Sequence, residues 1–278
     1  MSGTLYLCAT PIGNLGDVSM RCLEVFNMVD LIAAEDTRRT IQLLNHFEIS
    51  KPLTSYHEHN KREKGEYITN LLAEGKNVAL VSDAGTPAIS DPGEDLVKMC
   101  IEKGLNVTTI PGPVAAINAL ILSGLNATRF AFEGFLSVNK RHRKLHLESV
   151  KNDTHTLIFY EAPHKLRYTL NDMKDTFGGD RRIAMVRELT KIHEEVIRCT
   201  IDEAIALYAE NNPRGEYVVV VEGAKENSNE ENWWDEMSAI DHVNEYISRG
   251  MSEKDAIKQA AKDRNVPKRE IYNEYVNR

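Results

Sequence analysis

Two histidines separated by one residue offer the clearest acid–base chemistry in the sequence. His57 and His59 lie in the segment Tyr56-His57-Glu58-His59-Asn60 and project to the same side if that segment is extended. A zinc site would need a third ligand and usually a carboxylate behind a histidine, and the sequence indicates neither. A histidine near a reacting hydroxyl could act as a base or as an orienting donor. The alternative is a polar loop whose histidines face solvent, and the spacing leaves both open.

Loops rich in proline and glycine follow three predicted strands. They cover residues 9–17, 82–93 and 111–116, and the last two together contain four prolines and three glycines. Such loops at the carboxyl edge of an α/β sheet bind ligands, and their free backbone groups can hold a small molecule. The first loop matches neither a dinucleotide-binding nor a P-loop fingerprint. It also fits a tight turn in which Asp17 or Ser19 caps the next helix.

A charged segment opens a predicted helix after the second strand. In Glu35-Asp36-Thr37-Arg38-Arg39, Thr37 is the candidate N-cap. Arg38 and Arg39 then fall in the first helical turn, where cations oppose the helix dipole. Arginines placed against that preference indicate an anionic partner such as RNA phosphate.

A second basic run has four fixed cations in the five positions Lys140-Arg141-His142-Arg143-Lys144. It predicts a basic rim together with other cations at Lys61, Arg62, Arg181 and Arg182. A solvated helical face explains the same run.

The composition is that of a folded protein with about two domains. The chain has 278 residues, 42% hydrophobic and 27% charged, which excludes disorder and fibrous repeats as its main description. No apolar run approaches the roughly 18 residues of a membrane span, and the N-terminus has no secretory signal, so we expect a cytoplasmic protein. The net charge of −8 argues against indiscriminate coating of nucleic acid. We expect the four separated cysteines to be buried and apolar, at Cys8, Cys22, Cys100 and Cys199.

Short apolar runs alternate with amphipathic ones, which predicts two successive α/β domains. The first series of strands is expected at residues 4–9, 30–34, 52–55, 77–81 and 106–110, with a helix over 64–72. The second series is expected at residues 130–135, 156–160, 182–187, 194–200 and 217–221. The short connection between Arg187 and Glu194 predicts an antiparallel hairpin, so the second sheet is mixed.

The predicted organisation has four parts. We expect an N-terminal α/β domain over residues 1–124 and a C-terminal α/β domain over 125–224. A polar acidic stretch indicates a linker over 225–232. Residues 233–278 form a small helical appendage that resembles a helix-turn-helix, with Ser252 as an N-cap and Asn265-Val266-Pro267 as the turn. Its cations also fit a solvated face.

Five motifs in chain order resemble the tetrapyrrole methylase superfamily, the class III S-adenosylmethionine-dependent methyltransferases, over about residues 3–223. The motifs are residues 9–17, 34–38, 56–60, 82–87 and 160–164. They are most similar to the branch that methylates the ribose 2′-oxygen of a decoding-centre cytidine in small-subunit ribosomal RNA. The general superfamily has Gly-Asp-Pro where this chain has Asp83-Ala84-Gly85-Thr86-Pro87, which is the pattern of the RNA branch.

The resemblance implies two α/β domains with S-adenosylmethionine in the cleft between them. It also implies a homodimer. The cofactor is expected to contact residues of six loops: Pro11; Asp83, Ala84, Gly85, Ile89 and Ser90; Ala115 and Ala116; Tyr160 and Glu161; Glu188 and Leu189; Gly215 and Glu216.

The sulfonium activates the methyl group, so the enzyme must align the ribose hydroxyl and help its proton leave. We expect the catalytic group to be one of His57, Glu35, Asp36 and Asp83, and no metal. The expected RNA-binding residues are Arg38, Arg39, Lys140, Arg141, Arg143 and Lys144. The partner is small-subunit ribosomal RNA or the assembled subunit. Two alternatives remain, a tetrapyrrole or small-molecule methylase of the same fold and a non-catalytic RNA-binding assembly factor.

Overall fold

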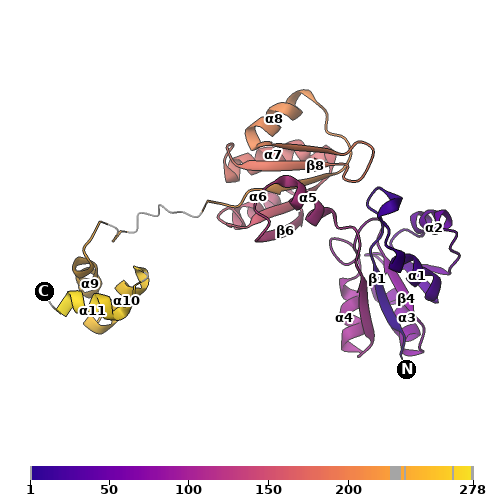
Figure 1. Cartoon of the computed structure of the whole chain (residues 1–278), viewed down its shortest axis with the longest axis horizontal. Coiled ribbons are helices and arrows are strands. Elements are labelled where there is room, and N and C mark those ends of the chain that lie inside the picture. The colour runs from indigo at the N-terminus through magenta and orange to yellow at the C-terminus, as the bar shows by residue number, and fades with distance from the viewer. Residues whose placement is uncertain (1, 226–232, 235, 265, 277–278) are drawn as a thin grey trace. The chain divides into compact units, whose positions relative to one another are not determined.

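The computed structural model describes residues 2–225, 233–234, 236–264 and 266–276 and divides the chain into two compact units, Met1–Ala224 and Lys225–Arg278 (Figure 1). Residues 226–232 of the predicted linker lie outside the described residues. Across the described part, no helix is long and apolar enough to cross a membrane.

The first unit begins with a parallel five-stranded sheet in the order β3-β2-β4-β1-β5. Its strands β2 and β4 are apolar and completely buried, because helices cover both faces of a parallel sheet. The bounds are β1 (Thr4–Cys8), β2 (Leu31–Ala34), β3 (Leu53–Ser55), β4 (Val78–Val81) and β5 (Asn106–Ile110).

Four helices cover this sheet in pairs. Cys22 and Phe26 of α1 and Leu44 of α2 pack on one face, and Ile68 of α3 and Leu96 of α4 pack on the other. A short 3₁₀ helix, η1 (Leu15–Asp17), precedes α1. Of the two predicted caps of α1, Asp17 and Ser19, the structure has Ser19. The bounds are α1 (Met20–Met28), α2 (Thr37–His46), α3 (Lys61–Ala73) and α4 (Glu94–Glu102).

The second sheet is mixed, as predicted, with the order β6-β7-β10-β8-β9. β6 and β7 are parallel and the other neighbours are antiparallel, which confirms the predicted β8–β9 hairpin. The bounds are β6 (Phe130–Phe135), β7 (Thr156–Glu161), β8 (Arg182–Arg187), β9 (Glu195–Thr200) and β10 (Tyr217–Val221).

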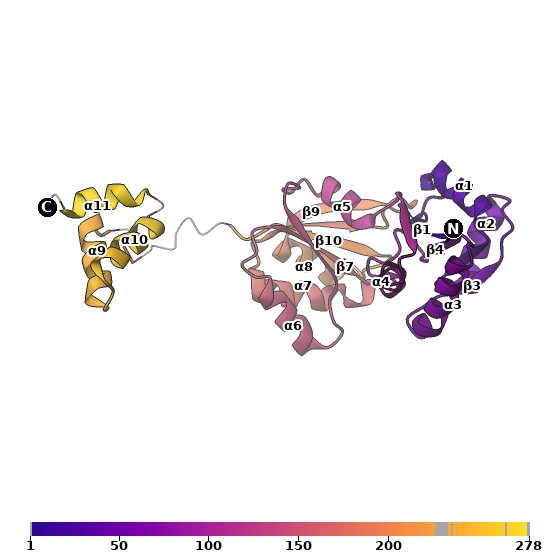
Figure 2. The ribbon, with the colours of Figure 1, turned by 90° about the horizontal axis from the view of Figure 1, so that it is seen from below.

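Three helices cover one face of the second sheet, and α5 lies on the other (Figure 2). Ala116, Ala119 and Leu120 of α5 pack against Ile158, Val218 and further apolar residues of β7, β8 and β10. α5 therefore packs on the second sheet, although the predicted domain boundary at residue 124 places it in the N-terminal domain. The bounds are α5 (Ala115–Ser123), α6 (Lys140–Ser149), α7 (Pro163–Phe177) and α8 (Ile201–Glu210).

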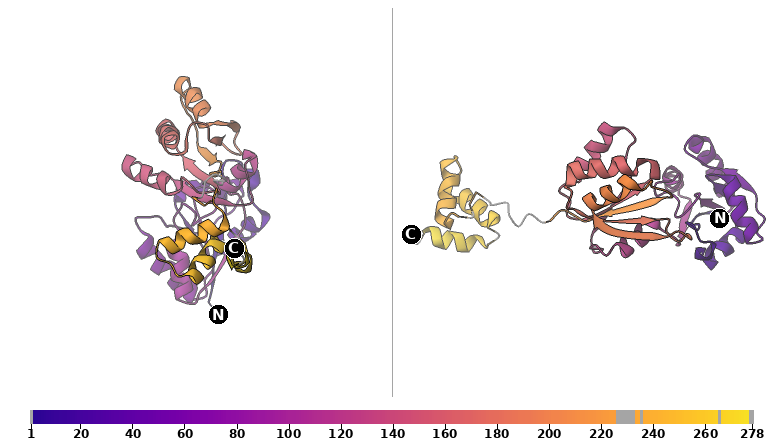
Figure 3. Two further views of the ribbon diagram at one scale, coloured as in Figure 1. Left: turned by 90° about the vertical axis from the view of Figure 1, so that its left-hand side faces the viewer. Right: turned by 90° about the horizontal axis from the view of Figure 1, so that it is seen from above.

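The second unit is a three-helix unit with its own apolar core (Figure 3). Its helices are α9 (Ala239–Ser248), α10 (Glu253–Asp263) and α11 (Lys268–Val276). Ser252 caps α10, as predicted, by accepting a hydrogen bond from the backbone N–H of Asp255. Of the predicted turn, Asn265 lies outside the described residues, as do 235, 277 and 278 of the appendage.

Candidate active site

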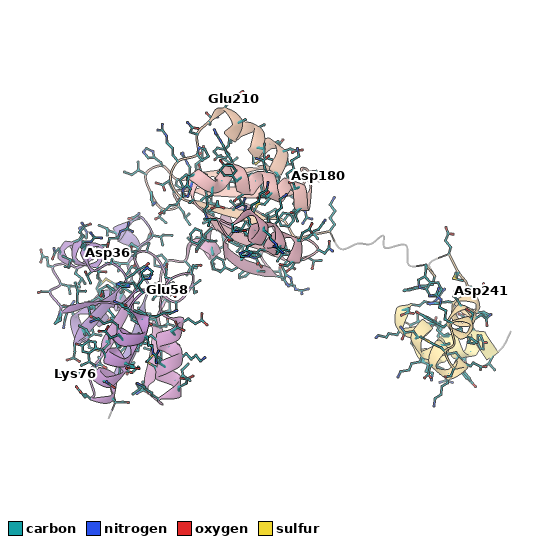
Figure 4. All side chains as sticks on the ribbon, turned by 180° about the vertical axis from the view of Figure 1, so that it is seen from behind. Asp36, Glu58, Lys76, Asp180, Glu210 and Asp241 are labelled. Carbon is teal, nitrogen blue, oxygen red and sulfur yellow. The ribbon has the colours of Figure 1, made fainter. Side chains whose placement is uncertain are left out.

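The four predicted catalytic residues all follow strands of the first sheet at its carboxyl edge. Glu35 and Asp36 follow β2, His57 follows β3, and Asp83 follows β4. Because β3, β2 and β4 are neighbours in a parallel sheet, these residues gather at one edge. Asp36 and Glu58 lie at this end of the sheet in Figure 4, and Lys76 lies at the other.

Asp83 connects the loops after β2 and β4. Its Oδ1 accepts a hydrogen bond from the backbone N–H of Asp36 at 3.0 Å, and its Oδ2 pairs with Arg39 at 3.2 Å. The backbone N–H of Asp83 donates to Oε2 of Glu35 at 3.4 Å. Both carboxylate oxygens of Asp83 are therefore engaged within the chain.

Asp36, not the predicted Thr37, is the N-cap of α2. Its Oδ1 accepts from the backbone N–H of Arg38 at 2.9 Å, and Oδ2 pairs with the Arg38 guanidinium at 2.8 Å. The hydrogen bonds from Arg38 lower the pKa of Asp36 to about 2. Arg38 and Arg39 thus have carboxylate partners in this chain, which offset their unfavourable position in the helix dipole. A carboxylate with so low a pKa is a weak base near neutral pH.

Asp91 is an acidic residue that sequence reasoning did not select. Burial, with the nearby charges of Glu35 and Asp83, raises its pKa to about 6, while a hydrogen bond from Ser82 acts in the opposite direction. The charge of Asp91 also contributes to the raised pKa of Tyr160, which burial mainly causes. Asp91 therefore interacts electrostatically with Glu35, Asp83 and Tyr160, and its pKa is suited to proton transfer near neutral pH.

Residues 58–60 form a turn, so the extended segment that would project His57 and His59 to the same side is not present. Asn60 folds back inside this turn: its Oδ1 accepts from the backbone N–H of His57 at 2.9 Å, and its Nδ2 donates to the carbonyl of Ser55 at 3.3 Å. Nδ2 lies 3.2 Å from Nε2 of His57. Since Nδ2 is a donor, Nε2 accepts and Nδ1 carries the proton. Nδ1 is buried and has no hydrogen-bond partner among the described residues.

Among the described residues, no cluster of three or more His, Cys, Asp or Glu side chains is arranged to hold a metal ion. Cys8, Cys22 and Cys100 are buried as predicted, whereas Cys199 is only half-buried, since it lies on the edge strand β9.

The predicted cofactor loops contact one another in the first unit. Backbone hydrogen bonds in both directions join Thr10 and Gly85, so the loops after β1 and β4 are paired next to Pro11 and Ala84. A Cβ on Gly13 would lie 2.4 Å from Cγ of Lys191 and 3.0 Å from Oγ1 of Thr190. Only a glycine lets the loop after β1 approach the loop after β8 this closely.

Strained backbone gathers in two of these loops. Ala88 and Ser90, next to Ile89, have φ of 68° and 64°, and Glu188 and Thr190, flanking the buried Leu189, have 50° and 65°. Left-handed conformations are costly for residues other than glycine and cluster at ligand-binding sites. The hydroxyl of Thr190 is buried without a hydrogen-bond partner among the described residues.

Two glutamates hold the β8 and β10 loops together. The backbone N–H of Glu216 donates to Oε1 of Glu188 at 2.9 Å, and Lys191 pairs with both carboxylates at 2.9 Å. Gly215 has φ of 78°, and a Cβ there would lie 2.5 Å from Cγ of Glu188. The side chain of Glu188 is occupied by these contacts.

Tyr160 joins the second sheet to α5. Its hydroxyl accepts from the backbone N–H of Ala116 at 3.2 Å, next to Ala115, and its ring packs against Phe132 and Phe135. The next residue, Glu161, is buried and bonded to Thr169 and to Lys165, the latter at 3.0 Å. Any contact of Glu161 with a ligand is therefore through its backbone.

The predicted RNA-binding cations differ in availability. Arg38, Arg39, Lys140 and Arg141 are exposed, and Lys144 is half-buried and paired with Asp175. Arg143 was expected to bind RNA but is not available to it. It is buried and pairs with Asp172 at 2.7 Å, and it donates to the carbonyls of Ser137 and Val138. Every fourth residue of α6 faces inward, so a basic run on this helix cannot be exposed throughout.

Comparison with known proteins decides the family. Residues 4–205 match the tetrapyrrole (corrin/porphyrin) methylases. The chain belongs to the tetrapyrrole methylase family. It is 52% identical over 275 residues to the ribosomal RNA small subunit methyltransferase I of Bacillus subtilis, covering 98% of this chain and 94% of that protein. It is 46% identical to the protein of the same name from Synechocystis, covering 97% of this chain and 96% of that one.

Solved structures share the fold of this family. Diphthine synthase matches with a TM-score of 0.60 at 15% identity, over 80% of this chain and 90% of that one. The uroporphyrin-III-C-methyltransferase of Thermus thermophilus matches with a TM-score of 0.55 at 18% identity, over 78% and 94%. The expected fold class, two α/β domains of the tetrapyrrole methylase type, is confirmed.

Family membership makes S-adenosylmethionine the methyl donor, and the residues present fit it. The unpartnered hydroxyl of Thr190 and the strained backbone at Ser90 and Glu188 offer polar groups at the junction of the two sheets. Acidic side chains at the edge of the first sheet suit a cationic ligand, since opposite charges attract strongly in a partly desolvated site.

Proposed function

We propose that this chain transfers the methyl group of S-adenosylmethionine to the ribose 2′-oxygen of a cytidine in small-subunit ribosomal RNA. The observation that carries the proposal is the 52% identity to a ribosomal RNA small subunit methyltransferase I over 98% of the chain. The acidic, desolvated edge of the first sheet supports it, because a ribose hydroxyl needs a group that takes its proton.

The cofactor would be held by the loops after β1, β4, β7 and β8 and before β10 and α5. In this arrangement Pro11, the 83–90 loop, Glu188, Leu189, Gly215 and Glu216 contact it mainly through the backbone, because Glu161 and Glu188 use their side chains internally. Bound there, S-adenosylmethionine supplies a methyl group that its sulfonium already activates.

Asp91 would be the group that accepts the ribose proton. Its pKa of about 6 leaves it mostly ionised at neutral pH and still basic enough to bind a proton. As the methyl carbon would leave the sulfonium sulfur, which becomes a neutral thioether, and bond to the ribose oxygen, the hydroxyl proton would pass to Asp91. Asp36 is much less basic, and both oxygens of Asp83 are engaged.

His57 would act as a donor. Because Asn60 makes Nε2 the acceptor, the proton lies on Nδ1, which is buried and has no hydrogen-bond partner among the described residues. A substrate that reaches this buried atom would accept its hydrogen bond. Glu35 raises the pKa of Asp91 by its charge and so tunes the base.

The active chain would be a homodimer. All of α5 except Asn118 and Ser123 is apolar, yet Ile117 and Ile121 remain 39% and 67% exposed. Phe130 and Phe135 of the edge strand β6 are also exposed. Apolar side chains exposed beside a sheet face that a single helix covers indicate a protein interface. We further propose that the chain works in the cytoplasm on assembled or free small-subunit RNA.

The test is methyl transfer from labelled S-adenosylmethionine to three acceptors. These are small ribosomal subunits from cells lacking the activity, naked small-subunit RNA, and uroporphyrinogen. Label in the subunit or the RNA supports the proposal. Label in the porphyrin contradicts it and favours a small-molecule methylase, and cofactor binding without any transfer favours a non-catalytic RNA-binding factor.

A further inference from the structure

Three lysines form one row along α10. Lys254, Lys258 and Lys262 are four residues apart and are all exposed. Residues four apart lie on the same face of a helix, one turn above another. The opposite face of α10 carries Ala256, Ile257, Ala260 and Ala261, which are buried in the core of the second unit.

The next helix continues this pattern at its start. Lys268 and Arg269 are exposed in the first turn of α11, where positive charge opposes the helix dipole. Ile271 and Tyr275 are buried in the core, while Tyr272 is 49% exposed. Glu270 and Glu274 lie on the other side of α11 from Tyr272, by helical spacing.

Three aspartates of this unit make hydrogen bonds inside it. Asp255 bonds to Ser252 and Asp241 bonds to Ser238, both at helix N-caps. Asp263 accepts from the Tyr246 hydroxyl at 2.6 Å. These bonds hold the fold together and leave the row of lysines without carboxylate partners.

The arginines at the centre of the unit have internal roles as well. Arg264 donates to Nδ1 of His242 and to three backbone carbonyls. Arg249 pairs with Glu245 and lies over the ring of Trp233. Among the described residues of α10 and α11, five exposed cations thus have no ion pair: Lys254, Lys258, Lys262, Lys268 and Arg269.

We propose that these five residues, the α10–α11 cation surface, bind the phosphate backbone of the RNA substrate. The inference rests on the proposed function and adds a second RNA contact on a unit separate from the methylating one. Lysines are mobile point charges that neutralise phosphates without reading bases, so the contact contributes affinity irrespective of RNA sequence. An anionic membrane is disfavoured, because the apolar face of α10 is buried in the unit's core and cannot enter lipid.

The test compares two triple variants of the full chain with equal loss of charge. K254Q/K258Q/K262Q removes the row on α10. The control K76Q/K98Q/K151Q removes three exposed lysines of the first unit. Binding of a fluorescein-labelled RNA hairpin is measured by anisotropy over a series of KCl concentrations.

The α10 variant is expected to bind at least about tenfold more weakly at physiological salt, and the slope of log K against log salt should fall by about 2. The control should bind like the wild type. Wild-type affinity and slope in the α10 variant, or an equal loss in the control, would overturn the proposal. So would weaker binding to small ribosomal subunits with unchanged binding to the naked hairpin, since the partner would then be a ribosomal protein.

Methyl transfer separates this inference from the proposed function. The α10 variant should show a raised KM for the subunit and an unchanged kcat, because the lysines lie outside the methylating unit. If the wild type transfers no methyl group to RNA yet binds it through the lysines, the proposed function fails and this inference stands. If the wild type methylates RNA and the variant keeps its KM, only this inference fails.

Discussion

The side-chain amide of Asn60 holds His57 in one tautomer. Oδ1 of Asn60 accepts from the His57 backbone N–H at 2.9 Å, which fixes Nδ2 as the donor 3.2 Å from the imidazole Nε2. Nδ1 therefore carries the proton, and it is buried without a hydrogen-bond partner among the described residues. Asn60 precedes α3 but makes no side-chain cap with it, which indicates that this amide serves the histidine.

Exchanging this amide for a carboxylate should change the tautomer. In Asn60→Asp both oxygens accept, so Nε2 becomes the donor and Nδ1 loses its proton. We expect kcat for methyl transfer to fall at least about tenfold, as it should in His57→Ala, while KM for S-adenosylmethionine stays the same. In the double variant Asn60→Asp with His57→Ala, kcat should be no lower than in the more impaired of the two single variants. Asn45→Asp, at an exposed position of α2, is the control, and an unchanged kcat in Asn60→Asp would refute the positioning role.

Asp91 should set the acidic limb of the pH profile. With a pKa near 6, kcat should fall about tenfold per pH unit below that value, because the protonated carboxyl cannot accept a proton. Asp91→Asn should lower kcat about 100-fold and remove the limb. Glu35→Gln should move the limb to lower pH, because it removes a charge that raises this pKa. A limb that stays in place in Glu35→Gln would contradict the assignment.

The same carboxyl predicts a stability effect of defined sign. The native pKa of Asp91, about 6, lies above the ordinary value of an aspartate, so ionising Asp91 costs the native state more than the unfolded one. Its unfavourable contribution is absent below about pH 4, grows as pH rises from about 4 to about 6, and is fully present above that. Asp91→Asn should therefore be more stable than the wild type at pH 8 and about equal at pH 4, measured by urea unfolding. A variant less stable at pH 8 would contradict the burial of this charge.

Arg143 and Asp172 form a buried pair, so breaking it should destabilise the fold. Asp172→Ala leaves an uncompensated guanidinium and should lower the free energy of unfolding by about 3 kcal/mol. Replacing both partners, in Arg143→Met with Asp172→Leu, should recover most of that loss. KM for the ribosomal subunit should stay at the wild-type value in the double variant. A large rise in KM for the subunit would contradict this structural role and indicate that Arg143 binds RNA.

The apolar surface of α5 should hold two copies of the chain together. Ile121→Glu places a charge at the centre of the exposed stretch and should shift the chain from dimer to monomer in light scattering after gel filtration. Ile101→Glu, on α4 at a similar exposure of 66%, is the control. A wild-type monomer at micromolar concentration would contradict the proposed homodimer.

The strands could be predicted from the sequence because their apolar runs are short and bounded by turn residues. Four of them, among them Asn106–Ile110 and Arg182–Arg187, have the predicted bounds, and the others differ by one residue at one end. The packing of α5 could not be predicted in this way, because a helix that is apolar on all sides does not reveal which sheet it covers.

The gathering of the candidate residues at one edge of the sheet could be predicted from the sequence, whereas their electrostatics could not. Strand order brought Glu35, His57 and Asp83 to one edge, as the carboxyl-edge rule for parallel sheets requires. The importance of Asp91 comes from desolvation and two neighbouring charges, and these are properties of the folded chain. The burial of Arg143 likewise depends on an acid 29 residues away.

The most direct test of the central claim is the identity of the methylated nucleoside. Small subunits from cells lacking the activity are incubated with the chain and S-adenosylmethionine, and the RNA is digested to nucleosides for mass spectrometry. We predict 2′-O-methylcytidine with the wild type and about 100-fold less in the same time with Asp91→Asn. A cytidine methylated on its base, or equal yields from the two proteins, would contradict ribose methylation with Asp91 as the proton acceptor.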